Sequence, residues 1–127
     1  MKILVVEDDR VTAHIYATWL IKAGYEVKIA KRGPEALAQV GLWGPDGVLL
    51  DVMLPDLNGI EALKRIRTEA PKLPVVVCTN AYNPTVVEQA MTAGATRIFD
   101  KSKLTALDLV AEFKGALSPA VRKRLAA

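Results

Sequence analysis

The sequence has almost none of the side chains that build disulfide frameworks and zinc sites. Its 127 residues include one cysteine, Cys78, and one histidine, His14. A single cysteine excludes an internal disulfide and a four-cysteine zinc site, and a single histidine excludes the two-histidine motifs of zinc enzymes. We therefore expect a fold without covalent cross-links, with Cys78 as a small buried apolar side chain.

Long apolar runs and a strong excess of one charge are also missing. A membrane helix needs about 20 apolar residues in a row, and acidic Glu7 precedes any apolar region that a signal peptide would need. The 17 basic and 14 acidic residues give a net charge of +3, which does not argue for nucleic-acid binding unless it is clustered. We expect a cytoplasmic protein that contacts no membrane and no nucleic acid directly.

Five short apolar runs, each followed by a helical pattern, make up most of the chain. Hydrophobic residues are 51% of the total and charged residues 24%, as in one globular domain. The runs are mostly rich in β-branched residues, which favours strands; they occupy residues 3–6, 27–30, 48–50, 75–78 and 97–99. This alternation predicts an α/β fold, a parallel sheet with helices on both faces.

The chemistry of the runs also predicts the order of the strands. The first, third and fourth runs are apolar throughout, as strands buried on both faces should be. The second and fifth contain Lys28 and Arg97, which suit partly solvated edges. This pattern is compatible with a flavodoxin-like, doubly wound sheet of five parallel strands, in the order 2-1-3-4-5, with five helices.

Capping residues and apolar spacing predict helices between these strands. Asp9 is expected to cap the first helix. The apolar residues at helical spacing, which we expect to face inward, are Val11, Ile15 and Trp19 in the first helix and Leu107, Val110 and Phe113 in the last. We expect one domain over residues 1–118, followed by a short basic tail or helix end at 119–127.

Polar side chains collect where the predicted strands end. Glu7 and Asp8 follow the first strand and Asp51 ends the third, while Thr79 ends the fourth and Lys101 follows the fifth. Because ligands of open parallel sheets bind at the carboxyl ends of the strands, we expect these five residues to converge on one crevice. Taken singly, Thr79 and Lys101 are equally compatible with ordinary structural positions.

The charges of this cluster call for a cation. Glu7, Asp8 and Asp51 carry three negative charges at short range, and such crowding requires a cation or raised pKa values. Carboxylate oxygens suit Mg²⁺ better than Zn²⁺. Mg²⁺ together with Lys101 would balance the three carboxylates, and a balanced site with open metal positions can accept a phosphoryl group.

At these residues the sequence resembles a known family over nearly its whole length. The segments ILVVEDD, GVLLDVMLPDLNGIEALKRIR, LPVVVCTNA and GATRIFDK are similar to those of the receiver domains of two-component response regulators, of the chemotaxis-regulator type. The middle segment is the specific one, since it places Pro55 and Gly59 after the aspartate.

The resemblance implies a role for each residue of the crevice. Asp51 would be the phosphoacceptor, and Glu7 and Asp8 the metal pair, with Asp8 and the backbone carbonyl of Met53 as direct Mg²⁺ ligands. Thr79 and Lys101 would contact the phosphoryl oxygens. The implied partners are a sensor histidine kinase or phosphotransfer protein, which donates the group from a phosphohistidine, and a downstream protein.

The sequence departs from the family pattern at the positions that transmit the signal. Ile98 stands where an aromatic switch residue is usual, and Phe99 follows it, on the other face of a regular strand. Ser102 replaces the proline that usually follows the lysine, and Asn80 replaces a small residue. We therefore expect phosphorylation to be transmitted through the fourth helix and the loop 80–83, without an aromatic switch.

Other functions remain open from sequence. A phosphorylation-independent interaction module with the same fold is the main alternative, favoured by the altered signalling positions. A Mg²⁺-dependent phosphohydrolase usually needs a second aspartate where this chain has Met53, and a nucleotide-binding module needs a glycine-rich loop that is lacking. With about ten residues after the last helix, we expect output by docking, homodimerisation or onward phosphotransfer, unless the chain is a fragment.

Overall fold

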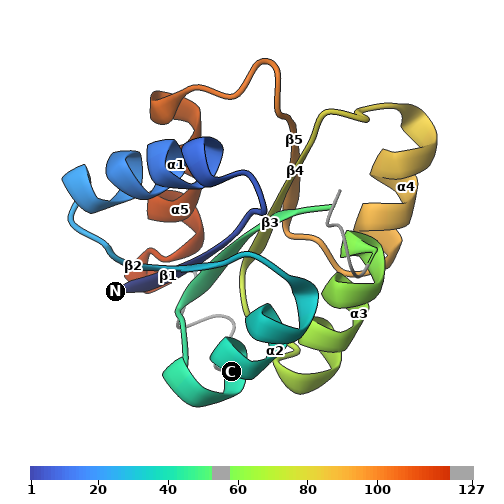
Figure 1. Cartoon of the computed structure of the whole chain (residues 1–127), viewed down its shortest axis with the longest axis horizontal. Helices are drawn as coiled ribbons and strands as arrows, with labels where there is room; N and C mark the ends of the chain where they lie inside the picture. The colour runs from blue at the N-terminus through green and yellow to red at the C-terminus, as the bar shows by residue number, and fades with distance from the viewer. Residues whose placement is uncertain (53–57, 121–127) are drawn as a thin grey trace.

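The computed structural model describes residues 1–52 and 58–120 and contains the predicted alternation of strands and helices (Figure 1). The strands are β1 (Lys2–Val6), β2 (Glu26–Ala30), β3 (Gly47–Asp51), β4 (Val75–Thr79) and β5 (Arg97–Asp100). The helices are α1 (Arg10–Lys22), α2 (Gly33–Trp43), α3 (Gly59–Glu69), α4 (Pro84–Thr92) and α5 (Ala106–Ala116). All neighbouring strands are parallel, in the order β2-β1-β3-β4-β5, which confirms the predicted fold.

Solvent exposure follows the predicted division into central and edge strands. Every residue of β3 and β4 is buried, whereas β2 buries Ala30 and leaves Lys28 and Ile29 exposed. A strand between two neighbours and two helical layers has no solvated side, so it is apolar throughout. An edge strand keeps a solvated margin, where a lysine can extend its ammonium into water.

Helices α1 and α5 cover one face of the sheet, and α2, α3 and α4 cover the other (Figure 1). Alternate residues of β1 point to opposite faces, as the period of two requires. Ile3 and Val5 pack with α1 and α5, and Leu4 and Val6 pack with the other three helices. Each large apolar side chain buried in this way contributes roughly 1.5–3 kcal/mol.

The predicted inward faces of α1 and α5 were wrong in part. Val11 and Ile15 are 67% and 42% exposed, and Leu107 is 79% exposed. The residues that α1 buries are Ala13, Tyr16, Ala17 and Leu20, and those that α5 buries are Leu109 and Phe113. Both helices carry apolar residues on more than one side, so spacing alone did not fix which side faces the sheet. In α1 the small side chains of Ala13 and Ala17 lie on the buried side.

The start of α3 is held against the end of β3 by a glycine. A Cβ at Gly59 would lie 2.2 Å from the Cα of Val52, and the Gly59 amide donates to the Val52 carbonyl at 3.0 Å. No side chain fits there, so glycine is required for this close approach. The contact fixes the chain just beyond Asp51, the residue that ends β3.

The predicted tail, residues 119–127, lies mostly outside the described part of the chain. Helix α5 ends at Ala116, and residues 121–127 are the part that is not described. None of the helices in residues 1–52 and 58–120 has the length and apolar character of a membrane span.

Candidate functional site

Three carboxylates meet at the carboxyl ends of the central strands. Glu7 follows β1, Asp8 comes next, and Asp51 is the last residue of β3. One oxygen from each lies within 4.8 Å of the others. Glu7 and Asp51 are 1% and 3% exposed, whereas Asp8 is exposed to solvent. The strand order predicted this convergence, because β1 and β3 are neighbours in the sheet.

Lys101 joins two of these carboxylates. Its Nζ donates to Oε2 of Glu7 at 2.6 Å and to Oδ2 of Asp51 at 3.1 Å. The backbone helps to place it, since the Lys101 amide donates to the Thr79 carbonyl at 2.9 Å. The Lys101 side chain is 12% exposed, so this ion pair is poorly screened by water.

Burial and charge crowding perturb the pKa values of this group. Burial raises the pKa of Glu7 from its ordinary range to about 7; the Lys101 hydrogen bond opposes this change and the Asp51 charge adds to it. Burial alone would lower the pKa of Lys101, but the hydrogen bond to Glu7 and the charge of Asp51 raise it above its usual value. The cluster therefore holds more negative charge than one ammonium neutralises.

A cavity of about 430 Å³ opens over these residues to solvent. Its lining consists of Glu7, Asp8, Asp9, Thr12, Tyr16, Asp51, Asn80 and Lys101. Asp9 also caps α1 as predicted, accepting from the Thr12 amide at 3.1 Å and from the Thr12 hydroxyl. Thr12 and Tyr16 were not predicted as site residues; the available signal was their spacing, because Thr12 lies three residues after the predicted cap Asp9 and Tyr16 four residues after Thr12.

Two of the predicted site positions within the described residues, Thr79 and Ile98, are not part of this lining. Thr79 ends β4 but is fully buried, and its hydroxyl accepts a hydrogen bond from the Ala81 amide at 3.0 Å. Ile98 packs in the core beside α2, α3 and α4, whereas Phe99 packs on the α1 and α5 face, as the strand alternation predicted. Met53 lies outside the described residues.

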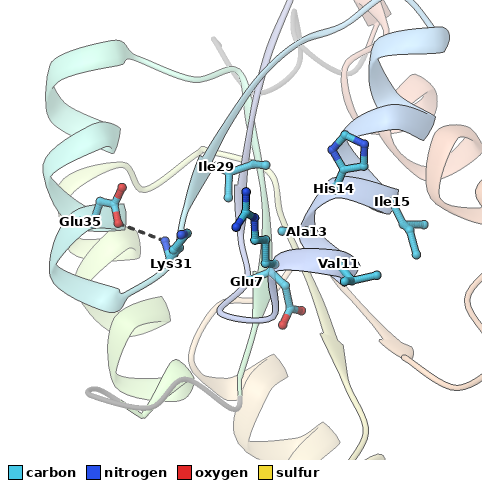
Figure 2. A pocket seen from close by; sticks show the side chains of 9 residues that line it. Glu7, Val11, Ala13, His14, Ile15, Ile29, Lys31 and Glu35 are labelled. Carbon is cyan, nitrogen blue, oxygen red and sulfur yellow. Dashed lines mark hydrogen bonds between the residues drawn. The ribbon is translucent and has the colours of Figure 1, made fainter.

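A second cavity, of about 720 Å³, lies along α1 and shares Glu7 with the acidic site (Figure 2). Its lining residues come from α1, from the end of β2 and from the start of α2. In Figure 2, Val11 and Ile15 extend from α1 and Ile29 from β2, and the Lys31 amide donates to Glu35 at 3.1 Å. The apolar residues that we expected inside the fold thus form part of the surface next to the site.

The acidic group fits a hard divalent cation. Its ligand atoms are carboxylate oxygens at close spacing, and one of the three carboxylates is open to solvent. Oxygen ligands with room for water are the surroundings in which proteins bind Mg²⁺. The raised pKa of Glu7 also indicates that a bound cation would be favourable here, because positive charge stabilises the ionised carboxylate.

Comparison with known proteins agrees with this geometry. Residues 3–112 match the family described as response regulator receiver domain. A CheY-like receiver domain protein from Methanospirillum hungatei superposes with a TM-score of 0.90 at 27% identity, covering 96% of this chain and 97% of that one. A putative response regulator from Chloroflexus aurantiacus gives 0.86 at 32% identity, covering 92% and 97%.

Longer proteins share part of this sequence. The response regulator MprA of Mycobacterium avium is 40% identical over 79 residues, which are 62% of this chain and 35% of the relative. The match thus spans about a third of the length of such curated relatives. The family match covers most of the chain, and the sheet and acidic site are those expected of it. The chain belongs to the response regulator receiver domain family, the phosphoacceptor module of two-component signalling.

Proposed function

We propose that Asp51 accepts a phosphoryl group from a phosphohistidine on a partner sensor histidine kinase or phosphotransfer protein. The main support is the placement of Lys101, whose ammonium contacts both Glu7 and Asp51 within a solvent-open acidic cavity. A carboxylate held beside a fixed positive charge is arranged to bind and stabilise a transferring phosphoryl group. The reaction would take place in the cytoplasm.

In the proposed reaction an Asp51 oxygen attacks phosphorus. The new O–P bond forms as the N–P bond of phosphohistidine breaks, and the electron pair returns to the imidazole nitrogen. Lys101 offers its ammonium to the phosphoryl oxygens. Glu7, Asp8 and Asp51 would hold Mg²⁺, which supplies the positive charge that screens the incoming group from these carboxylates.

Thr79 would carry the signal away from the site. Its hydroxyl accepts from the Ala81 amide, so a movement of Thr79 toward the phosphoryl group would pull on the loop 80–83. This loop leads into α4, whose N-cap Asn83 accepts from the Val86 amide at 3.0 Å. Ile98 lacks the aromatic ring of a usual switch, and the proposed output therefore passes through α4 to a downstream protein or a second copy of the chain.

Intact mass after incubation with Mg²⁺ and acetyl phosphate tests the proposal. We expect a gain of about 80 Da, one phosphoryl group, in the wild type. Asp51→Asn should show no gain. Asp100→Asn is the matched control, because Asp100 ends the edge strand β5 and its carboxylate accepts from Ser102; it should be phosphorylated like the wild type.

A phosphorylation-independent interaction module is the second candidate. The altered positions Ile98 and Ser102 favour it, because they remove parts of the usual signalling machinery. Absence of any mass gain with acetyl phosphate and with phosphorylated kinase domains, while Mg²⁺ still binds, would support this candidate and refute the proposed phosphotransfer.

A further inference from the structure

Strand β2 is an open edge of the sheet, and half of its backbone groups have no neighbouring strand. The Glu26 amide donates to the carbonyl just before β1, and the Ala30 carbonyl accepts from the amide just after β1, both at 3.0 Å. Because the backbone groups of a strand point alternately to its two sides, the even-numbered residues of β2 bond to β1. The amides and carbonyls of Val27 and Ile29 therefore point away from the sheet, and in the described part of the chain no strand pairs with them.

The side chains of β2 are open as well, and two of them carry opposite charges. Glu26 and Lys28 are exposed, and Ile29 is 38% exposed. Neither Glu26 nor Lys28 forms an ion pair within the described residues. The Lys28 ammonium lies 5.2 Å from the centre of the Trp43 ring, on the α2 side of the sheet. Since residues two apart on a strand share a face, Glu26 lies on that side too.

The order of these charges selects one way to pair β2 with the β2 of a second copy. A lysine on an edge strand usually opposes such pairing. In an antiparallel pair with Lys28 on the two-fold axis, two lysines meet, and with Glu26 on the axis two glutamates meet. With Val27 on the axis, Glu26 of each copy lies opposite Lys28 of the other. Opposite charges directly across an antiparallel pair are stabilising, whereas like charges there are destabilising.

We propose that β2 is a homodimer interface, in which two copies pair antiparallel about Val27 and join their sheets into one. This register uses the backbone groups that point outward. The two Val27 residues exchange both of their N–H···O bonds, and the Ile29 amide of each copy donates to the Tyr25 carbonyl of the other. That carbonyl points away from β1, because it lies opposite the Glu26 amide across a trans peptide bond.

The other edge strand, β5, lacks this complementarity. Its charged residues Arg97 and Asp100 are three positions apart, so their side chains point to opposite faces of the sheet. Arg97 also lies 3.8 Å from Glu112 of its own chain. Pairing two β5 strands would therefore gain no opposite-charge pair, and the charge pattern favours β2.

Sedimentation equilibrium of the full chain tests the interface. The unphosphorylated wild type, without Mg²⁺ or phosphodonor, should change from one chain to two as its concentration rises to about 1 mM, a range that detects even weak association. A wild type that stays monomeric throughout would overturn the inference. No residue of β2 lines the acidic cavity, so this result does not depend on whether Asp51 accepts a phosphoryl group.

Exchanging the two charges tests the register. Glu26→Lys or Lys28→Glu alone places like charges opposite each other and should raise the dimer dissociation constant at least tenfold. A mixture of these two variants should form a heterodimer, and a chain with both substitutions should dimerise like the wild type. Lys72→Glu is the matched control, because Lys72 is exposed before β4, away from β2. Equal dissociation constants for Lys28→Glu and Lys72→Glu would refute the assignment.

Hydrogen exchange at low and high protein concentration locates the paired backbone. The amides of Val27 and Ile29 should exchange more slowly in the dimer, because they gain partners there. The Glu26 amide already has a partner in its own chain and should not change. Protection that appears only in other segments would contradict an interface at β2.

Discussion

At the scale of single residues, Glu7 is a buried carboxyl group whose pKa responds to the excess of negative charge in the site. Its two oxygens accept from the Asp9 amide at 3.2 Å and from Lys101 at 2.6 Å, and its side chain is almost fully buried. These bonds favour the ionised form, yet burial prevails and raises the pKa to about 7. Between about pH 4.5 and pH 7, the metal-free protein therefore retains a proton on Glu7 that the unfolded chain has already lost.

This pKa predicts a pH dependence of stability in the metal-free protein. A raised folded-state pKa gives stability that is fully present below the unfolded pKa and is lost as pH rises through the folded pKa. In chelator, we expect the free energy of unfolding of the wild type to decrease as the pH rises from about 4.5 to above 7. This decrease should exceed that of Glu7→Gln by on the order of 3 kcal/mol. Urea unfolding at a series of pH values measures it. Parallel profiles for the two proteins would show that Glu7 is not the cause.

At the scale of elements, a half-buried arginine joins the ends of α3 and α4. The Arg67 guanidinium donates to the Gly94 carbonyl from Nε at 3.1 Å and from a terminal nitrogen at 2.6 Å. Its other terminal nitrogen donates to the carbonyls of Ala70, Pro71 and Leu73. Because Gly94 lies in the turn after α4, these bonds hold the C-terminal end of that helix.

Gly94 permits the contact with Arg67 by its backbone conformation and by its lack of a side chain, so its replacement should lower the free energy of unfolding. Its φ is +106°, and a Cβ there would lie 2.9 Å from Nε of Arg67. We expect Gly94→Ala to destabilise the protein by about 2 kcal/mol. Gly115→Ala is the control: Gly115 lies within α5 with open space around it, so alanine should be neutral or stabilising by up to about 1 kcal/mol. Denaturant unfolding compares the two, and equal effects would contradict this account.

The opposite end of α4 is connected to the site, which predicts where the protein moves. Thr79 accepts from Ala81, and Ile98 is 9% exposed within the core. When a beryllofluoride phosphoryl mimic binds, we expect the largest methyl NMR shifts at Ala81, Val86 and Val87, with little change at Ile98. A dominant shift at Ile98 would mean that the aliphatic residue still acts as the switch.

At the scale of the whole molecule, the topology brings together carboxylates whose mutual repulsion a bound metal ion would reduce. The strand order places the ends of β1 and β3 side by side. Within residues 1–52 and 58–120, three carboxylates meet there, and the Lys101 ammonium lies between two of them. A ligand that binds the folded form and not the unfolded one stabilises the fold by mass action.

Mg²⁺ should therefore stabilise the whole domain. At a concentration 100 times the dissociation constant, we expect a gain of about 2.7 kcal/mol and a higher Tm. Asp8→Asn should lose most of this gain. Asp9→Asn should keep it, because asparagine caps a helix about as well as aspartate. Thermal unfolding with Mg²⁺ or with chelator provides the measurement; a Tm that Mg²⁺ leaves unchanged would contradict the metal site.

Much of the fold and part of the site could be predicted because their signals are local. The apolar runs were confirmed as strands, and the lysine and arginine in the second and fifth runs marked the edges correctly. Glu7, Asp8, Asp51 and Lys101 come together because each lies at the carboxyl end of its strand or just beyond it. The burial of Val11, Ile15 and Leu107 was predicted wrongly, because apolar spacing does not say which side of a helix meets the sheet.

The sequence by itself thus determined the elements, their order in the sheet and the charged residues at its carboxyl edge. These follow from side-chain chemistry and from the period of two in a strand, and both can be read from residues that are close in sequence. The tertiary structure decided which faces of the helices are buried, the hydrogen bond from the Ala81 amide to Thr79, and the place of Tyr16 in the lining of the acidic cavity. Each of these depends on the rotation of a packed helix or on the path of a loop, which is set by contacts between residues distant in sequence.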